Sequence, residues 1–181
     1  MPQPRYHYDV LNINSFIVDI VKAPTIRYHV QEATLPDISL GSVTQANPFL
    51  DIANAGDKLT YGDFSMTFMV DEMLFNYGAL HTWIKGLGFP TCWTDYQKLI
   101  NGDHGNQELL TLSRGTRNEV SDIVVTILTN HKNPKASFIL HDAFPTSLSG
   151  LQMNVTDQDT TPVTCTATFK FTGMTFRPSA A

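Results

Sequence analysis

The chain has 181 residues, of which 42% are hydrophobic and 16% charged, and its formal net charge is −5. A typical soluble domain has about 25% charged residues, so this composition favours a surface that is largely covered by partner molecules. No basic run is present that would hold nucleic acid through its phosphates, which argues against a nucleic-acid reader. No apolar stretch approaches the about 20 residues of a membrane-spanning helix, and no apolar segment of a secretory signal follows the first residues.

Residues 1–14 mix prolines with aromatic residues and are expected to form an arm outside the core. Two interpretations of the arm stay open. Either Tyr6 and Tyr8 pack on a neighbouring subunit, or the segment is a frayed terminus.

Alternating apolar residues predict three extended segments after the arm. The first two cover residues 16–21 and 26–31, and the Ala-Pro pair between them favours a hairpin. The third covers residues 38–44.

Residues 45–61 combine turn residues with apolar ones in an unusual way. Either this segment is a loop folded over its own core, or it is a long hairpin whose apolar residues dock on another chain. An exposed apolar hairpin is an aggregation hazard for a monomer, so we favour docking. The residues expected to contact another copy in or near it are Val43, Phe49, Leu50, Ile52, Leu59 and Tyr61.

Residues 56–88 form the centre of the predicted fold. Residues 64–70 alternate as a half-buried strand does, and Asp71 is suited to cap a helix over about residues 72–86. Gly86 and Gly88 can end that helix, and a proline follows them.

The segment from residue 89 to 117 has weak periodicity, and we expect a surface excursion with a short helix from Thr94 onward. Residues 122–129 are apolar on both faces, which predicts a strand deep in a sheet. A turn over 131–134 then leads into an antiparallel strand over 136–140. Phe144-Pro145 is expected to end that strand, and residues 146–150 to form a single helical turn.

The last strand is the clearest, because apolar residues alternate with threonines from residue 163 to 172. Gly173 then shifts the alternation, which predicts a β-bulge. The whole pattern predicts one mainly β domain over residues 1–181, an antiparallel sandwich or barrel with one flanking helix.

The sequence offers little chemistry. Its six histidines show no metal-binding spacing, and His81 is expected in the core. His141-Asp142 is a suggestive pair without a nucleophile elbow. Cys92 and Cys165 are expected to be free thiols, buried or half-buried. We therefore expect no catalytic residues, no metal and no cofactor.

Two segments together resemble a known family. The first is Gly56-Asp57-Lys58 with the strand and the Val70-Asp71-Glu72 helix start that follow. The second runs from Phe144-Pro145-Thr146 to the strand of residues 163–171, and a Leu-Pro turn at Leu35-Pro36 lies upstream. In this order they are similar to the tail tube protein of contractile-tailed, T4-like bacteriophages, over about residues 16–177. The longer N-terminal arm and the excursion at 89–117 depart from that pattern.

The resemblance implies a structural virion protein without enzymatic activity. Its copies would form six-fold rings that stack into a hollow tube inside a contractile sheath, in contact with baseplate and tail-terminator proteins. Viral DNA would pass through the bore without specific binding, and the segment 43–61 would reach onto the adjacent ring.

Three alternatives stay open. In the first, the chain is a baseplate tube initiator or the inner-tube protein of a secretion system. Whether its copies stack on themselves without limit would separate these possibilities from one another. It is a monomeric ligand-binding β-sandwich with a pocket lined by Trp83, Trp93 or Tyr96. Or it is an enzyme built around His141-Asp142.

Overall fold

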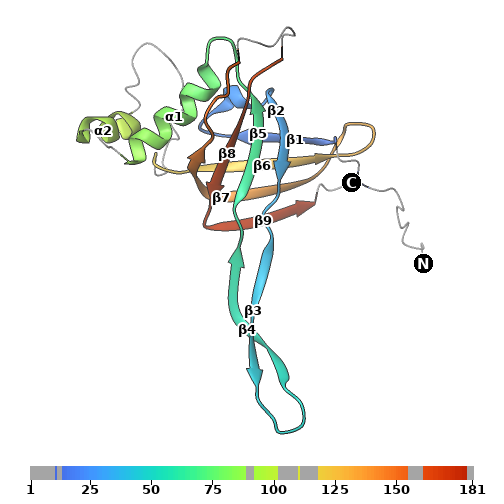
Figure 1. Cartoon of the computed structure of the whole chain (residues 1–181). Helices are drawn as coiled ribbons and strands as arrows, with labels where there is room; N and C mark the ends of the chain where they lie inside the picture. The colour runs from blue at the N-terminus through green and yellow to red at the C-terminus, as the bar shows by residue number, and fades with distance from the viewer. Residues whose placement is uncertain are drawn as a thin grey trace.

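The computed structural model describes residues 11, 14–88, 92–101, 110, 118–154 and 161–178. Strands dominate it, and two helices interrupt them near the middle of the chain (Figure 1). The elements are β1 (Phe16–Ile20), the 3-10 turn η1 (Pro24–Ile26), β2 (Val30–Thr34), β3 (Ile38–Gln45), β4 (Ile52–Tyr61), β5 (Phe64–Met69), α1 (Phe75–Gly88), α2 (Trp93–Asn101), β6 (Ser121–Leu128), β7 (Pro134–Leu148), β8 (Thr164–Lys170) and β9 (Gly173–Pro178).

Two antiparallel sheets cross one another and share the long strand β7 (Figure 1). Sheet A has the order β1-β6-β7-β9, and it uses the first half of β7. Sheet B has the order β2-β5-β8-β7, and it uses the second half of β7, from Phe144 to Leu148. The predicted antiparallel sandwich or barrel is therefore confirmed.

The core lies between the two sheets, where alternate residues of each strand point inward. In β5 and β8 the alternation predicted from the sequence is the one observed, since every second residue is buried. The inward rows of β5 and β8 are Phe64, Met66, Phe68, Cys165, Ala167 and Phe169, and those of sheet A include Val18, Ile20, Ile123, Val125 and Leu140.

The strand β7 continues where the sequence predicted its end. It runs through Pro145 and changes sheets near Asp142, whose φ of 52° lies in the left-handed region that Asp tolerates better than most residues. Residues 146–148 are thus part of a strand, and the predicted turn over 146–150 is wrong.

The chain makes a matching corner at Gly173. Strand β8 ends in sheet B and β9 begins in sheet A, with the N–H of Thr172 donating to the carbonyl of His141 at 3.0 Å. The shifted alternation therefore marks a change of sheet, and the predicted β-bulge is wrong.

The predicted hairpin between residues 16–21 and 26–31 is also wrong. Strand β1 pairs with β6 in sheet A, whereas β2 pairs with β5 in sheet B. Pro24 begins the 3-10 turn between them, and the buried Ile26 anchors that turn in the core. The turn sends the two strands into different sheets.

The helix α1 begins at Phe75, so Asp71 is not its N-cap. It packs one face against the sandwich through Trp83, whose ring lies 6.3 Å from that of Phe169. A second helix, α2, packs on α1 and so corrects the single flanking helix expected from the sequence, although its position agrees with the short helix expected from Thr94 onward.

Candidate assembly surfaces

The hairpin of β3 and β4 projects far beyond the sandwich (Figure 1). It continues from β2 through residues 35–37 and leads into β5 through residues 62–63, so it extends the strands of sheet B. Its two strands pair in register from Ile38 opposite Tyr61 to Gln45 opposite Ile52. The segment predicted as a hairpin or loop over 43–61 is therefore a hairpin, and it begins five residues earlier.

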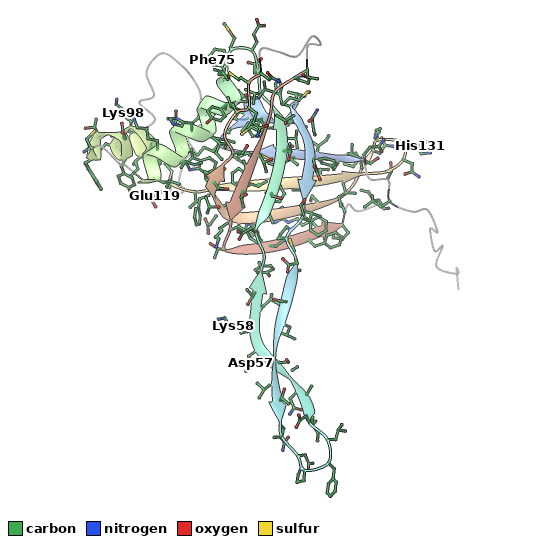
Figure 2. All side chains as sticks on the ribbon, viewed as in Figure 1. Asp57, Lys58, Phe75, Lys98, Glu119 and His131 are labelled. Atoms are coloured by element: carbon green, nitrogen blue, oxygen red, sulfur yellow. The ribbon has the colours of Figure 1, made fainter. Side chains whose placement is uncertain are left out.

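Glycines shape the middle of the hairpin. The pairing shifts between Leu40 and Ser42, and there a Cβ on Gly56 would lie 2.7 Å from the carbonyl oxygen of Gly41. Such a separation is too short for any side chain, so the two backbones can cross at this point only with glycine at position 56. Figure 2 shows Asp57 and Lys58 beside this crossing.

The hairpin exposes the apolar residues that the sequence singled out. Phe49 is 97% exposed and Leu50 72%, and Val43, Ile52 and Leu59 are also exposed. Tyr61 differs, because its ring packs on Phe171 at 5.5 Å and fixes the base of the hairpin to the sandwich. Tyr6 and Tyr8 lie outside the described residues. Whether these side chains contact another copy stays a prediction.

Sheet B presents a hydroxyl-rich outer face. The residues that alternate with its buried row are mostly Thr and Ser, and they stand opposite one another across the strands, as Thr67 and Thr166 do with their hydroxyl oxygens 3.1 Å apart. We call this the hydroxyl face; its hydroxyl residues are Thr34, Ser65, Thr67, Ser147, Thr164, Thr166 and Thr168. Glu32 and Lys170 are the charged residues on it.

A second group of exposed apolar side chains lies at the other end of sheet B. We call it the acceptor end; its residues are Tyr28, Met73, Leu74, Phe75 and Met153. The hydrogen bonds of Met69 to His29, of Val70 to Val163 and of Ser149 to Thr166 bring the segments that bear these residues to one end of the sheet.

Asn76 holds the segment between β5 and α1 in place. Its side chain is 1% exposed, its Oδ1 accepts the N–H groups of Asp71 and Tyr77 at 3.1 and 2.8 Å, and its Nδ2 donates to the carbonyl of Met69 at 2.7 Å. These bonds replace the helical turn that the sequence predicted from residue 72. Leu74 has a φ of 59° as a result, a strained conformation for a leucine.

A polar cluster joins the helices to the sandwich. The Lys22 ammonium donates to the carbonyl of Asn118 and lies 5.2 Å from the centre of the Trp83 ring. Burial lowers the pKa of Lys22 to about 8, against the opposing attraction of the Glu119 carboxylate. Glu119 in turn accepts the Tyr96 hydroxyl, which raises the pKa of Tyr96.

The candidates for chemistry are scattered. His141 Nε2 lies 2.9 Å from the Thr175 hydroxyl, and its Nδ1 lies 3.9 Å from Asp122, all on the exposed outer side of sheet A. His81 is exposed and stacks on Tyr77, so the expected core position is wrong. Cys165 is buried as expected, but Cys92 is exposed.

The described residues contain neither a metal-binding cluster nor a membrane-spanning helix. No group of three or more His, Cys, Asp or Glu is placed to hold a metal ion. No helix among them is long and apolar enough to cross a membrane. Of the residues expected to line a ligand pocket, Trp83 is buried in the core, and Trp93 and Tyr96 pack against each other on α2, with tilted rings whose centres lie 4.6 Å apart.

Solved structures of the anti-feeding prophage and of an extracellular contractile injection system have similar folds. A chain of the anti-feeding prophage tube-terminating cap matches with a TM-score of 0.64 and 13% identity, covering 98% of this chain and 97% of that one. A chain of the PVC sheath–tube complex in its extended state matches with a TM-score of 0.57 and 15% identity, covering 96% and 95%. A chain of the anti-feeding prophage baseplate matches with a TM-score of 0.59 and 10% identity, covering 95% and 98%.

The described residues thus form two crossed sheets with a projecting apolar hairpin and a second group of exposed apolar side chains at the acceptor end. The family model described as phage tail tube protein matches residues 6–176, and the chain belongs to that family. It is a structural component of a phage tail tube, as the sequence resemblance predicted. No curated protein matches the chain.

Proposed function

We propose that this chain forms six-fold rings that stack into the inner tube of a phage tail and that it has no enzymatic activity. The observation that carries the proposal is the hairpin, which displays Phe49 and Leu50 to solvent at the end of a long, thin arm. In a monomer these side chains create an aggregation hazard, whereas contact with an adjacent ring removes them from water.

The strand order of sheet B supports closure into a ring. Within the described residues, β2 lies at one end of this order and residues 144–148 of β7 at the other. Because the four strands alternate in direction, these outer strands run in opposite directions. Rotation about an axis along the strands would therefore place β2 of one copy antiparallel to residues 144–148 of the next, which satisfies both edges.

The hydroxyl face supports a role as the wall of a DNA conduit. A wall rich in lysine and arginine would hold phosphates by counterion release, whereas neutral hydroxyl groups give DNA little to bind. The surrounding sheath, the baseplate and the tail terminator would be the other partners, and the assembled protein would belong to the virion.

Electron microscopy of the purified protein at high concentration tests the assembly. Stacked rings of unlimited length are expected of a main tube subunit, and single rings of a baseplate initiator or a terminal ring. A strictly monomeric particle would refute the proposal. Replacing both Phe49 and Leu50 with Asp should leave rings but abolish stacks, whereas Asn133→Asp on the exposed β6–β7 turn should change neither.

Introducing a lysine into the hydroxyl face tests whether this face lines the bore of the tube. Tubes of Thr166→Lys should retain short duplex DNA at about 50 mM salt and release it at about 200 mM, because each ring would add one cation per subunit to the wall. The matched variant Asn133→Lys adds the same charge at the β6–β7 turn. Labelled DNA should become resistant to nuclease only with Thr166→Lys, and equal protection by both variants would place the hydroxyl face outside the bore.

A further inference from the structure

The acceptor end and the hairpin lie at opposite ends of the same strands. Strand β2 starts beside the end of β5, where Val30 pairs with Phe68, and both strands continue at their other ends into the hairpin. In Figure 2 Phe75 lies at one extremity of the molecule and the hairpin tip at the other. If a second copy is translated along the strands of sheet B, the hairpin tip of one copy meets the acceptor end of the other.

The acceptor end displays its apolar residues in a fixed shape. Met73 is 69% exposed and Tyr28 84%. Leu74 is held in a left-handed conformation by the bonds of Asn76 and by its own N–H, which donates to Asp71 at 2.9 Å. A surface organised before contact loses little conformational entropy when a partner binds, which favours docking.

We propose that the acceptor end receives the hairpin tip, residues 46–52, of a second copy in the adjacent ring. This inference rests on the proposed function and adds the receiving surface to it. The contact is head-to-tail, so it leaves one tip and one acceptor end free at the two ends of any stack, and addition of rings can continue without limit. Phe49 and Tyr28 provide aromatic side chains of the kind that dominate such contacts.

Few charged residues lie near this contact, and their weak mutual repulsion opposes it only slightly. The hairpin carries two Asp residues and one Lys, and the acceptor end is flanked by Arg27, Asp71 and Glu72, so each side has a net charge of −1. Arg27 is already held by Asp19 at 3.0 Å and lies over the Tyr28 ring. The surfaces that meet are therefore mainly apolar, and few charged groups have to leave water.

Disulfide cross-linking tests the pairing in assembled tubes. The background variant is Cys92→Ser, since Cys92 is exposed and Cys165 is buried. Phe49→Cys combined with Met73→Cys should give, under mild oxidation, a ladder of covalent oligomers on a non-reducing gel. Phe49→Cys combined with Thr166→Cys, a position on the hydroxyl face, should give none. Tubes that form and yield no ladder with Met73→Cys would overturn the acceptor assignment while leaving the proposed function intact.

A pair of charged substitutions tests the same contact if the cysteine variants do not assemble. Met73→Asp and Phe49→Lys should each lower the fraction of protein in tubes by at least tenfold, by placing a charge in an apolar contact, with rings preserved. The two changes in one chain should restore tubes, because the new charges would meet each other. No restoration, with each single variant still forming rings, would contradict the inference. Absence of rings and tubes in the unaltered protein would instead refute the proposed function itself.

Discussion

Replacing Asn76 with alanine should lower the free energy of unfolding by about 2–4 kcal/mol. The side chain is 1% exposed and makes three hydrogen bonds to the main chain, to Asp71, Tyr77 and Met69. A lost hydrogen bond costs about 1 kcal/mol, and about 1–3 kcal/mol where the remaining partner stays buried and unpaired. Alanine recovers some tenths of a kcal/mol, because it favours the helix more than asparagine does.

Urea or thermal denaturation measures this difference. The measurement belongs in the stacking-deficient Phe49→Asp, Leu50→Asp background, so that tube assembly does not add to the apparent stability. For a domain of this size the expected loss lowers Tm by roughly 4–16 °C. Asn54→Ala, on the exposed hairpin, is the matched control and should stay within about 0.5 kcal/mol of the parent. An equally small effect of Asn76→Ala would show that the three bonds do not hold the segment before α1.

Two glycines of α1 and one buried lysine give further predictions. Gly86→Ala should destabilise the fold by about 1–3 kcal/mol because its Cβ would lie 2.9 Å from the Cβ of a residue in α2, whereas Gly78→Ala, with open space around it, should stabilise it by about 0.5–1 kcal/mol; denaturation of both variants checks the contrast. Burial lowers the pKa of Lys22 from 10.5 to about 8, so the unfolded chain binds more protons than the folded chain between these values, and stability should rise as pH increases from about 8 to about 10. Above pH 10 the raised pKa of Tyr96 acts in the opposite direction. Lys22→Met should remove the rise, which denaturation at pH 8 and pH 10 measures directly.

Local alternation was enough to predict the strands that have one buried face. In β5 and β8 the apolar residues recur at every second position because the core lies on one side and solvent on the other. The hairpin was anticipated for a related reason, since Phe49 and Leu50 had no place in the core of a monomer. These signals lie within ten residues of one another, and a sequence displays them directly.

The pairing of strands that lie far apart in the sequence could not be predicted from local alternation. Nothing near Pro24 shows that β1 and β2 enter different sheets, because their pairing partners, β6 and β5, lie far along the chain. The continuation of β7 through Pro145 depends on Asp142 accepting a left-handed conformation. The start of α1 at Phe75 depends on the buried Asn76, which competes successfully with the Asp71 cap. The alternating threonines of residues 163–172 indicated one strand of the hydroxyl face, but β2, β5 and β7, which complete it, lie far from that strand in the sequence.

The hairpin that is proposed to join adjacent rings is a continuation of the sheet that is proposed to line the bore. Because β2 and β5 continue directly into β3 and β4, the strands that present the hydroxyl face also set the direction and reach of the arm. The packing of Tyr61 on Phe171 and the hydrogen bond from Gly62 to Asp37 fix the arm at its base. A change at that base should therefore tilt the arm away from the next ring without altering the tip, so Tyr61→Ala should weaken stacking even though Phe49 and Leu50 are intact. Normal tube length in that variant would show that the tip finds its partner without guidance from sheet B.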